Sequence, residues 1–150
     1  MFKIVDGSLD VVKLYEECFK SYKHKNYGAF LSFCGIVRAE DNIKALSFDI
    51  YEKLLLSWFS QWQKKVEKEG ILLCFAHSKG DVYLHESSFF VAVFSKNRKE
   101  GLITLNDFVE DFKANAPIWK YDFIGEEKIY AKNRSIKLKN AGLLGKNVSL

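Results

Sequence analysis

The sequence predicts an α+β fold with a mainly antiparallel sheet and two long amphipathic helices. Two stretches, 54–66 and 102–112, carry apolar residues at helical spacing, whereas 45–51 alternates apolar and polar residues as a strand does. Read along the chain, the elements follow the order β-α-β-β-α-β-β-β-α-β-β, which contains hairpins instead of strict βαβ alternation. At 150 residues the chain has the size of one hydrophobic core, so residues 1–150 are expected to form a single domain.

The N-terminal part predicts a strand, a helix and a second strand. Residues 2–5 form the first short strand, and Ser8 is the expected N-cap of the helix. The residues expected to share one helical face are Leu9, Val12, Tyr15, Cys18 and Phe19. Residues 29–38 carry apolar side chains on both faces and predict a buried strand. Gly35 inside this strand indicates a bulge or a close backbone approach.

The middle of the chain predicts a strand and the first long helix. In the alternating strand 45–51, Leu46 and Phe48 are expected to face the core and Ser47 the solvent. The helix has about four turns and ends near Gly70.

Strands are predicted next at 71–76 and 89–94, with turns at Gly80-Asp81 and His85-Glu86.

The second long helix begins at a recognisable cap. Asn97, followed three residues later by Glu100, resembles a capping box. The expected apolar stripe is Leu102, Leu105, Val109 and Phe112. Asn115 and Pro117 end the helix, and two short strands, 118–123 and 128–131, follow around Gly125.

Charge and cysteine content restrict the class of protein. The net charge of +4 is too small by itself to indicate nucleic-acid binding. Cys18, Cys34 and Cys74 are odd in number and form no CxxC pair, which favours reduced thiols in a cytoplasmic protein. Neither a signal-peptide pattern nor an apolar run of membrane-spanning length occurs, so no membrane partner is expected.

Few residues fit common catalytic or metal patterns. Cys74 and His77 have CxxH spacing, but residues three apart on a strand face opposite sides and cannot share an ion. Hydrolase and nucleotide-binding motifs are absent from the sequence. The acids around Asp107, Glu110 and Asp111 are expected to lie on a solvated helix face.

Basic residues give two candidate features. Lys96, Arg98 and Lys99 crowd the start of the second long helix, where free N–H groups and the helix dipole favour anions. An anion site and a solvated loop are about equally favoured there. Lys113 and Lys120 lie on either side of the predicted helix–strand corner at Pro117, which is compatible with a shared pocket. Arg38 ends the predicted strand 29–38 and becomes relevant if that end lies near the corner.

Four segments, in order, resemble the molybdopterin synthase large (catalytic) subunit family, and together they span residues 28–132. Gly28–Arg38 is similar to the family's GAxxxFxGxVR strand, and Ala76–Val82 to its HRxGx-hydrophobic turn. Val91–Arg98 is similar to VxVxSxHR, and Phe112–Lys120 to LKxxAPxWK. Residues 1–27 and 134–150 carry no part of the resemblance.

The resemblance implies an α/β-hammerhead fold, a homodimer, and a heterotetramer with two small ubiquitin-like sulfur-carrier subunits. Each carrier's C-terminal Gly-Gly thiocarboxylate would deliver sulfur to cyclic pyranopterin monophosphate, two transfers forming the dithiolene of molybdopterin. It implies a cytoplasmic sulfurtransferase with no cofactor, metal or nucleic acid. By the same resemblance Lys113 and Lys120 are catalytic, and the substrate-binding residues are Arg38, Asn97, Arg98 and Lys132. Both reactants are anions, so such a pocket requires fixed cations.

The chain departs from the family at one site position. Asn97 stands where the family has His, and it can cap a helix but cannot titrate. Two alternatives therefore stay open. One is a family member that binds its carrier without turnover. The other is a non-catalytic module that holds nucleic acid or another acidic partner through its basic cluster and tail.

Overall fold

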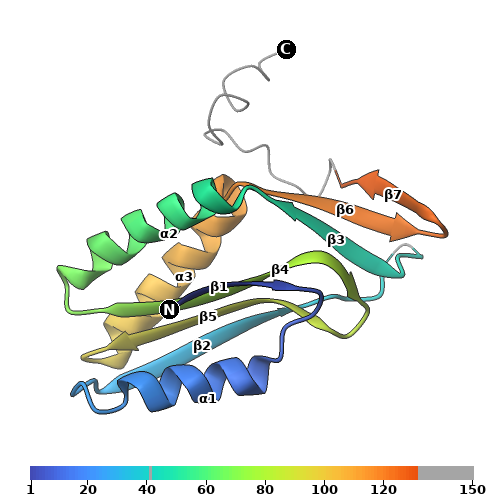
Figure 1. Ribbon diagram of the computed structural model, residues 1–150. Helices are drawn as coiled ribbons and strands as arrows, with labels where there is room; N and C mark the ends of the chain where they lie inside the picture. Colours follow the sequence, from blue (N-terminus) through green and yellow to red (C-terminus); the bar gives the residue numbers. More distant parts are fainter. Residues whose placement is uncertain (41, 132–150) are drawn as a thin grey trace.

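The computed structural model describes residues 1–40 and 42–131, and it shows a mixed sheet with helices on both faces (Figure 1). The elements, in chain order, are β1 (Phe2–Asp6), α1 (Val11–Tyr22), β2 (Ala29–Ile36), β3 (Ala45–Ile50), α2 (Glu52–Glu67), β4 (Leu72–Tyr83), β5 (Ser87–Ser95), α3 (Arg98–Asn115), β6 (Ile118–Ile124) and β7 (Glu127–Tyr130). All the strand pairings among these residues are antiparallel except that of β1 with β4. The α+β prediction is confirmed.

β4 joins two parts of the seven-stranded sheet, whose order is β2-β5-β4-β3-β6-β7 with β1 beside β4. Its first half, Leu72–His77, pairs with β5, and its last residues, from Gly80 to Tyr83, pair with β3. The predicted turn at Gly80-Asp81 is wrong. Gly80 has φ +77°, a conformation that glycine adopts readily, and the strand continues through it. Two strands, not three, therefore separate α2 from α3.

Ser47 on β3 is buried, although the alternation predicted that it faces solvent. It is 2% exposed and its Oγ donates a hydrogen bond of 2.6 Å to Asp81 Oδ1. Lys128 Nζ donates to the same hydroxyl at 3.1 Å and lies 2.8 Å from the Asp81 carboxylate. The hydrogen bonds with Asp81 and Lys128 thus bury Ser47, although the alternation of apolar and polar residues predicts that it is exposed.

α1 begins two residues later than predicted. Asp10 is its N-cap and accepts a hydrogen bond from Lys13 N at 3.0 Å. The predicted cap, Ser8, precedes Leu9, which is buried and whose N–H donates to Ser87 O. The face buried against the sheet contains Leu14 and Cys18, so the predicted apolar face is correct at Cys18 but not at the exposed positions. The large exposed residues of this helix are Val12, Tyr15 and Phe19.

β2 is an edge strand and ends at Ile36, short of the predicted limit at Arg38. The prediction that it is buried is wrong at Phe33, which is 42% exposed, and at Ile36, which is 60% exposed. The predicted irregularity at Gly35 is confirmed. The register with β5 shifts after this residue, and a Cβ there would lie 3.0 Å from Phe89 Cβ.

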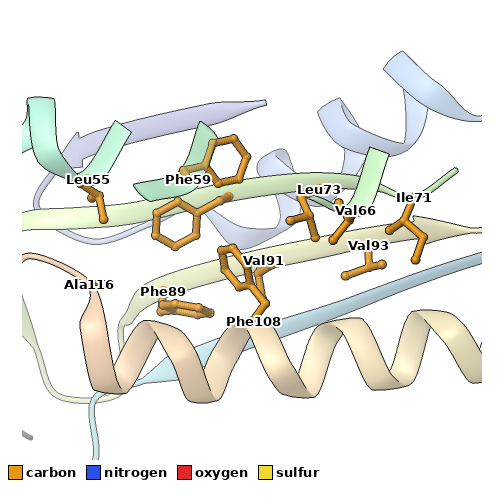
Figure 2. Packing of buried hydrophobic residues seen from close by; sticks show 11 residues of the cluster. Leu55, Phe59, Val66, Ile71, Leu73, Phe89, Val91, Val93, Phe108 and Ala116 are labelled. Carbon is orange, nitrogen blue, oxygen red and sulfur yellow. The ribbon is translucent and has the colours of Figure 1, made fainter. Parts of the chain in front are cut away.

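The main core lies between the sheet and the helices α2 and α3, while α1 covers the opposite face (Figures 1 and 2). The predicted helix 54–66 is confirmed as α2, and Gly70 follows it with φ +72°. The predicted stripe of α3 is only partly correct. Leu102 is 52% exposed, whereas Gly101 and Phe108 are buried. A Cβ at Gly101 would lie 2.3 Å from Leu31 Cδ1, so the helix approaches β2 closely at that point.

The two ends of α3 are fixed as the sequence predicts. Asn97 is the N-cap, and its side chain accepts a hydrogen bond from Glu100 N at 3.1 Å. The helix ends at Asn115, and β6 starts three residues later. The predicted C-terminal pair of strands is confirmed as β6 and β7, which form a hairpin around Gly125.

Candidate functional site

The two candidate catalytic lysines flank the corner between α3 and β6. Lys113 lies in the last turn of α3, with its Nζ 3.9 Å from Glu110 Oε1 and its side chain exposed. Lys120 lies on β6, directly opposite Phe48 of β3, and is partly buried. Pro117 and Ala116 between the two elements are buried, so the corner itself is packed against the protein. Two amino groups therefore sit on either side of a rigid turn.

A buried aromatic group lies beneath this corner. His77 of β4 stacks on Phe112, the neighbour of Lys113, with ring centroids 5.3 Å apart. It also meets the edge of Phe48, at 4.9 Å, and that of Phe89, at 6.0 Å. Burial lowers the pKa of His77 to about 4, although its hydrogen bond to Ser78 O opposes the shift. This imidazole is neutral near pH 7 and adds no charge beneath the lysines.

Arg38 lies beside the β4–β5 turn and away from the lysine corner. It follows β2, and its guanidinium pairs with Glu40 at 2.5 Å while remaining largely exposed. Its neighbour Val37 is buried in one cluster with Phe48. Val37 also exchanges backbone hydrogen bonds with His85 and Glu86 of the β4–β5 turn. The strand residue before this turn, Tyr83, pairs with Ala45, at the end of β3 opposite to the corner. A role for Arg38 beside the lysines therefore stays a prediction.

Asn97 and Arg98 lie at the other end of α3. Arg98 and Lys113 are fifteen residues apart on one helix, which at 1.5 Å per residue is about 22 Å. Lys96 and Lys99 are also exposed at this N-terminal end. A single chain thus brings Lys113 and Lys120 to one corner and leaves Asn97 and Arg98 at the other end of α3. The sixth candidate, Lys132, lies outside the described residues.

A groove between α2 and α3 has the wrong charge to hold the proposed anions. Its lining includes Trp58, Trp62 and Lys65 together with the acids Asp107, Glu110 and Asp111. The prediction that these acids are simply solvated is wrong for Asp111. Its Oδ2 accepts hydrogen bonds from the indoles of Trp58, at 2.9 Å, and Trp62, at 2.6 Å.

The charge of Asp111 is retained by these contacts. Burial raises the pKa of its carboxyl group, but donors from Trp62, Asn115 and Trp58 lower it, and the result lies below the usual 3.8. The two tryptophans spaced four residues apart on α2 were the sequence feature that could have predicted this tie between the helices.

Cys74 and His77 do not share a metal site. Cys74 faces α1 in the cluster with Cys18, whereas His77 faces Phe112 of α3 on the other side of the sheet. The parity argument from the sequence is confirmed. Among the described residues, no group of three or more His, Cys, Asp or Glu side chains is placed to hold a metal ion.

Comparison with protein families and known proteins places the chain. The model of the family described as MoaE protein matches residues 4–115. The molybdopterin synthase catalytic subunit of Helicobacter pylori strain 26695 is 52% identical over 96% of this chain and 99% of its own length. The corresponding subunit of Dictyostelium discoideum is 27% identical over 70% of this chain and 71% of its own length.

Solved structures show the same fold. A protein–protein complex of subunits 1 and 2 of molybdopterin-converting factor from Helicobacter pylori 26695 contains a chain with a TM-score of 0.89, 52% identity, and coverage of 95% of this chain and 98% of that one. Molybdopterin synthase from Staphylococcus aureus matches with a TM-score of 0.75 at 20% identity, covering 86% and 95% of the two chains, which shows the fold alone.

The chain belongs to the MoaE family, whose model matches from within β1 to the last residue of α3. The fold that it shares with the Helicobacter pylori chain extends over 95% of its length. By function it is a catalytic subunit of molybdopterin synthase, in the biosynthesis of the molybdenum cofactor. Of the functions left open by the sequence, the similarity therefore favours an enzyme subunit and not a nucleic-acid-binding module. Within the part of the chain that the structure describes, no helix is both long and apolar enough to cross a membrane.

Proposed function

We propose that the chain is the sulfur-transferring subunit of the synthase and that the α3–β6 corner is its reaction site. The observation that carries the proposal is the placement of Lys113 and Lys120 on either side of a buried corner. The sulfur donor would be the C-terminal thiocarboxylate of a small carrier subunit, and the acceptor cyclic pyranopterin monophosphate. Both are anions, which fixed cations hold and polarise.

The two lysines would have different tasks. Lys113 is exposed on a helix end and can reach a chain terminus that arrives from solvent, so it is the group nearest the thiocarboxylate. Lys120 is partly buried on a strand and would lie at the pterin. The Helicobacter pylori relative was solved in a complex of subunits 1 and 2, and we infer that this chain likewise assembles with a small subunit.

We further infer that a second copy of the chain completes the site. Asn97 and Arg98 are about 22 Å from Lys113 along α3, so one phosphate cannot contact both ends in one chain. β2 has an open edge that starts beside Ser95, near Asn97, and runs toward Arg38. Two-fold antiparallel pairing of this edge with its copy would place the start of one β2 beside the end of the other.

The surface along this edge suits a second copy. Exposed apolar residues occur on both sides of it: Phe33 lies on the face that contains Phe89, and Tyr15 of α1 on the opposite face. In the same two-fold arrangement α1 runs antiparallel to its copy. The Asp10 end of one helix would then approach the Lys20–Lys25 end of the other, which is a favourable pairing of charge.

The experiment is reconstitution with a thiocarboxylated carrier and cyclic pyranopterin monophosphate, followed by detection of dithiolene product. Lys113→Ala and Lys120→Ala are expected to abolish product, whereas Lys64→Ala, an exposed lysine on α2, is expected to retain it. An inactive wild type, or a fully active Lys113→Ala, contradicts the proposal.

Mixed dimers test the shared site. Lys113→Ala chains and Arg98→Ala chains are each expected to be inactive alone. Refolded together they should regain about a quarter of wild-type activity, because half of the dimers then hold one intact site of two. Light scattering should show a dimer that Ile36→Glu weakens. No recovery on mixing refutes the shared site.

The three cysteines are free thiols, which supports a reducing, cytoplasmic location. Cell fractionation tests this inference, and recovery from an oxidising compartment would contradict it.

A further inference from the structure

His77 is the one polar ring in the aromatic group beneath the lysine corner. It is 2% exposed and lies on β4 at the last residue that pairs with β5. Phe112 stacks on it with an interplanar angle of 28°, and Phe48 meets it edge-on at 82°. One imidazole thus contacts α3 through a stacked ring and β3 through a perpendicular one.

A hydrogen bond fixes the orientation of this ring. Its Nδ1 lies 2.7 Å from Ser78 O, and since a carbonyl can only accept, Nδ1 carries the proton. Along β4 the carbonyl of Lys79 accepts from Gly7 N on the β1 side. Because successive carbonyls alternate, Ser78 O faces the β5 side, just beyond the last registered pair, His77 with Phe89. The imidazole supplies a donor at this break in the ladder.

We propose that His77 is a positioning residue that holds the two lysine-bearing elements at a fixed separation. Phe112 immediately precedes Lys113, and Phe48 is the cross-strand partner of Lys120. The ring packed between them sets how far the end of α3 stands from the β3–β6 ladder. This inference rests on the proposed roles of the two lysines, and it adds a residue to which no catalytic contact is assigned.

Positioning the two elements requires both the flat ring of histidine and its N–H donor. Phenylalanine at this position would retain a flat ring for stacking on Phe112 but would leave Ser78 O without its donor. Glutamine would retain an N–H donor but could not stack. His77→Phe therefore removes only the hydrogen bond, and His77→Gln removes only the stacking. If His77 needs both interactions to position the lysines, either substitution should impair the enzyme.

The test is steady-state kinetics of dithiolene formation with His77→Phe and His77→Gln, each shown by circular dichroism to be folded. His24→Phe, in the exposed α1–β2 loop, is the matched control. Each His77 variant is expected to lower kcat at least ~10-fold while the KM for the carrier stays within about two-fold, because the ligand still binds but the amino groups are misplaced. The pH dependence of kcat should also shift, whereas His24→Phe should match the wild type.

Phe112→Leu provides a second route if a His77 variant fails to fold. It removes the stacked partner and is expected to reproduce the kcat defect, with less than additive loss in combination with His77→Gln. Two folded His77 variants with wild-type kcat and pH profile, or losses that simply add, overturn the positioning role. A wild type that makes no product refutes the proposed function instead, so the two failures are distinguishable.

Discussion

Lowering the pH should destabilise the folded protein through His77. The pKa of this buried imidazole is about 4 in the folded chain, against 6.5 in the unfolded chain. A depressed pKa means that the unfolded state binds the proton first, so stability is fully present above pH 6.5 and is lost as the pH falls toward 4. The whole difference is equivalent to about 3 kcal/mol, of which about 2 kcal/mol should be lost between pH 7.5 and 5.

Urea unfolding followed by tryptophan fluorescence measures this change, at one protein concentration throughout because association also affects stability. The comparison is between wild type and His77→Phe, which retains a buried ring but has nothing to protonate. Carboxyl groups such as Asp81 and Asp111 have pKa values below 3.8, so their stabilising contributions are lost only at lower pH. The free energy of unfolding of the variant should therefore change little over this range. A wild type that loses less than about 0.5 kcal/mol, or a variant that loses as much as the wild type, would refute the reasoning.

Four substitutions test the packing by the same urea assay. Gly28→Ala should cost about 2 kcal/mol, because its Cβ would lie 2.2 Å from the backbone oxygen of Lys96, and an unchanged midpoint would contradict that close approach. Phe75→Ala, at a fully buried ring, should cost about 4 kcal/mol, and a loss below 1 kcal/mol would show that the core collapses around it. Asp111→Ala should cost about 2 kcal/mol, since two indole N–H groups lose their acceptor. Asn97→Ala should cost about 1 kcal/mol through the lost cap, and no change would mean that the cap contributes nothing.

Helices and strands were predictable where local sequence alone determines them, through apolar spacing or a capping residue. The spacing of large apolar residues located α2, and Asn97 with Glu100 located the start of α3. The predictions failed where tertiary contacts override periodicity. Because glycine often ends a strand, the sequence predicts a turn at Gly80, but β4 continues through this residue. Ser47 was assigned to solvent because a network formed by Lys128, far along the chain, cannot be read from alternation.

The position of the two candidate lysines in the fold was predictable, whereas their catalytic roles stay predictions. The segment from Phe112 to Lys120 placed both lysines at a helix–strand corner, as the structure has them. The helix limits predicted from the sequence already separate Arg98 from Lys113 by a helix length, as the structure has it. His77 escaped notice as a neighbour of the site because its partners, Phe48 and Phe112, are distant in sequence and meet it only in the folded sheet.

The pairing pattern of the sheet also determines when the protein can fold during synthesis. β1 and β3 both pair with β4, and β2 pairs with β5. In the described chain none of the first three strands pairs with another of them. A ribosome that has made only the first 71 residues therefore exposes three apolar strands that have no ladder to join. Such a nascent chain depends on late, sequence-distant contacts, which form slowly and leave it open to aggregation. We expect C-terminal truncations before β4 to yield insoluble chains, and chaperone demand to be greatest just before β5 emerges.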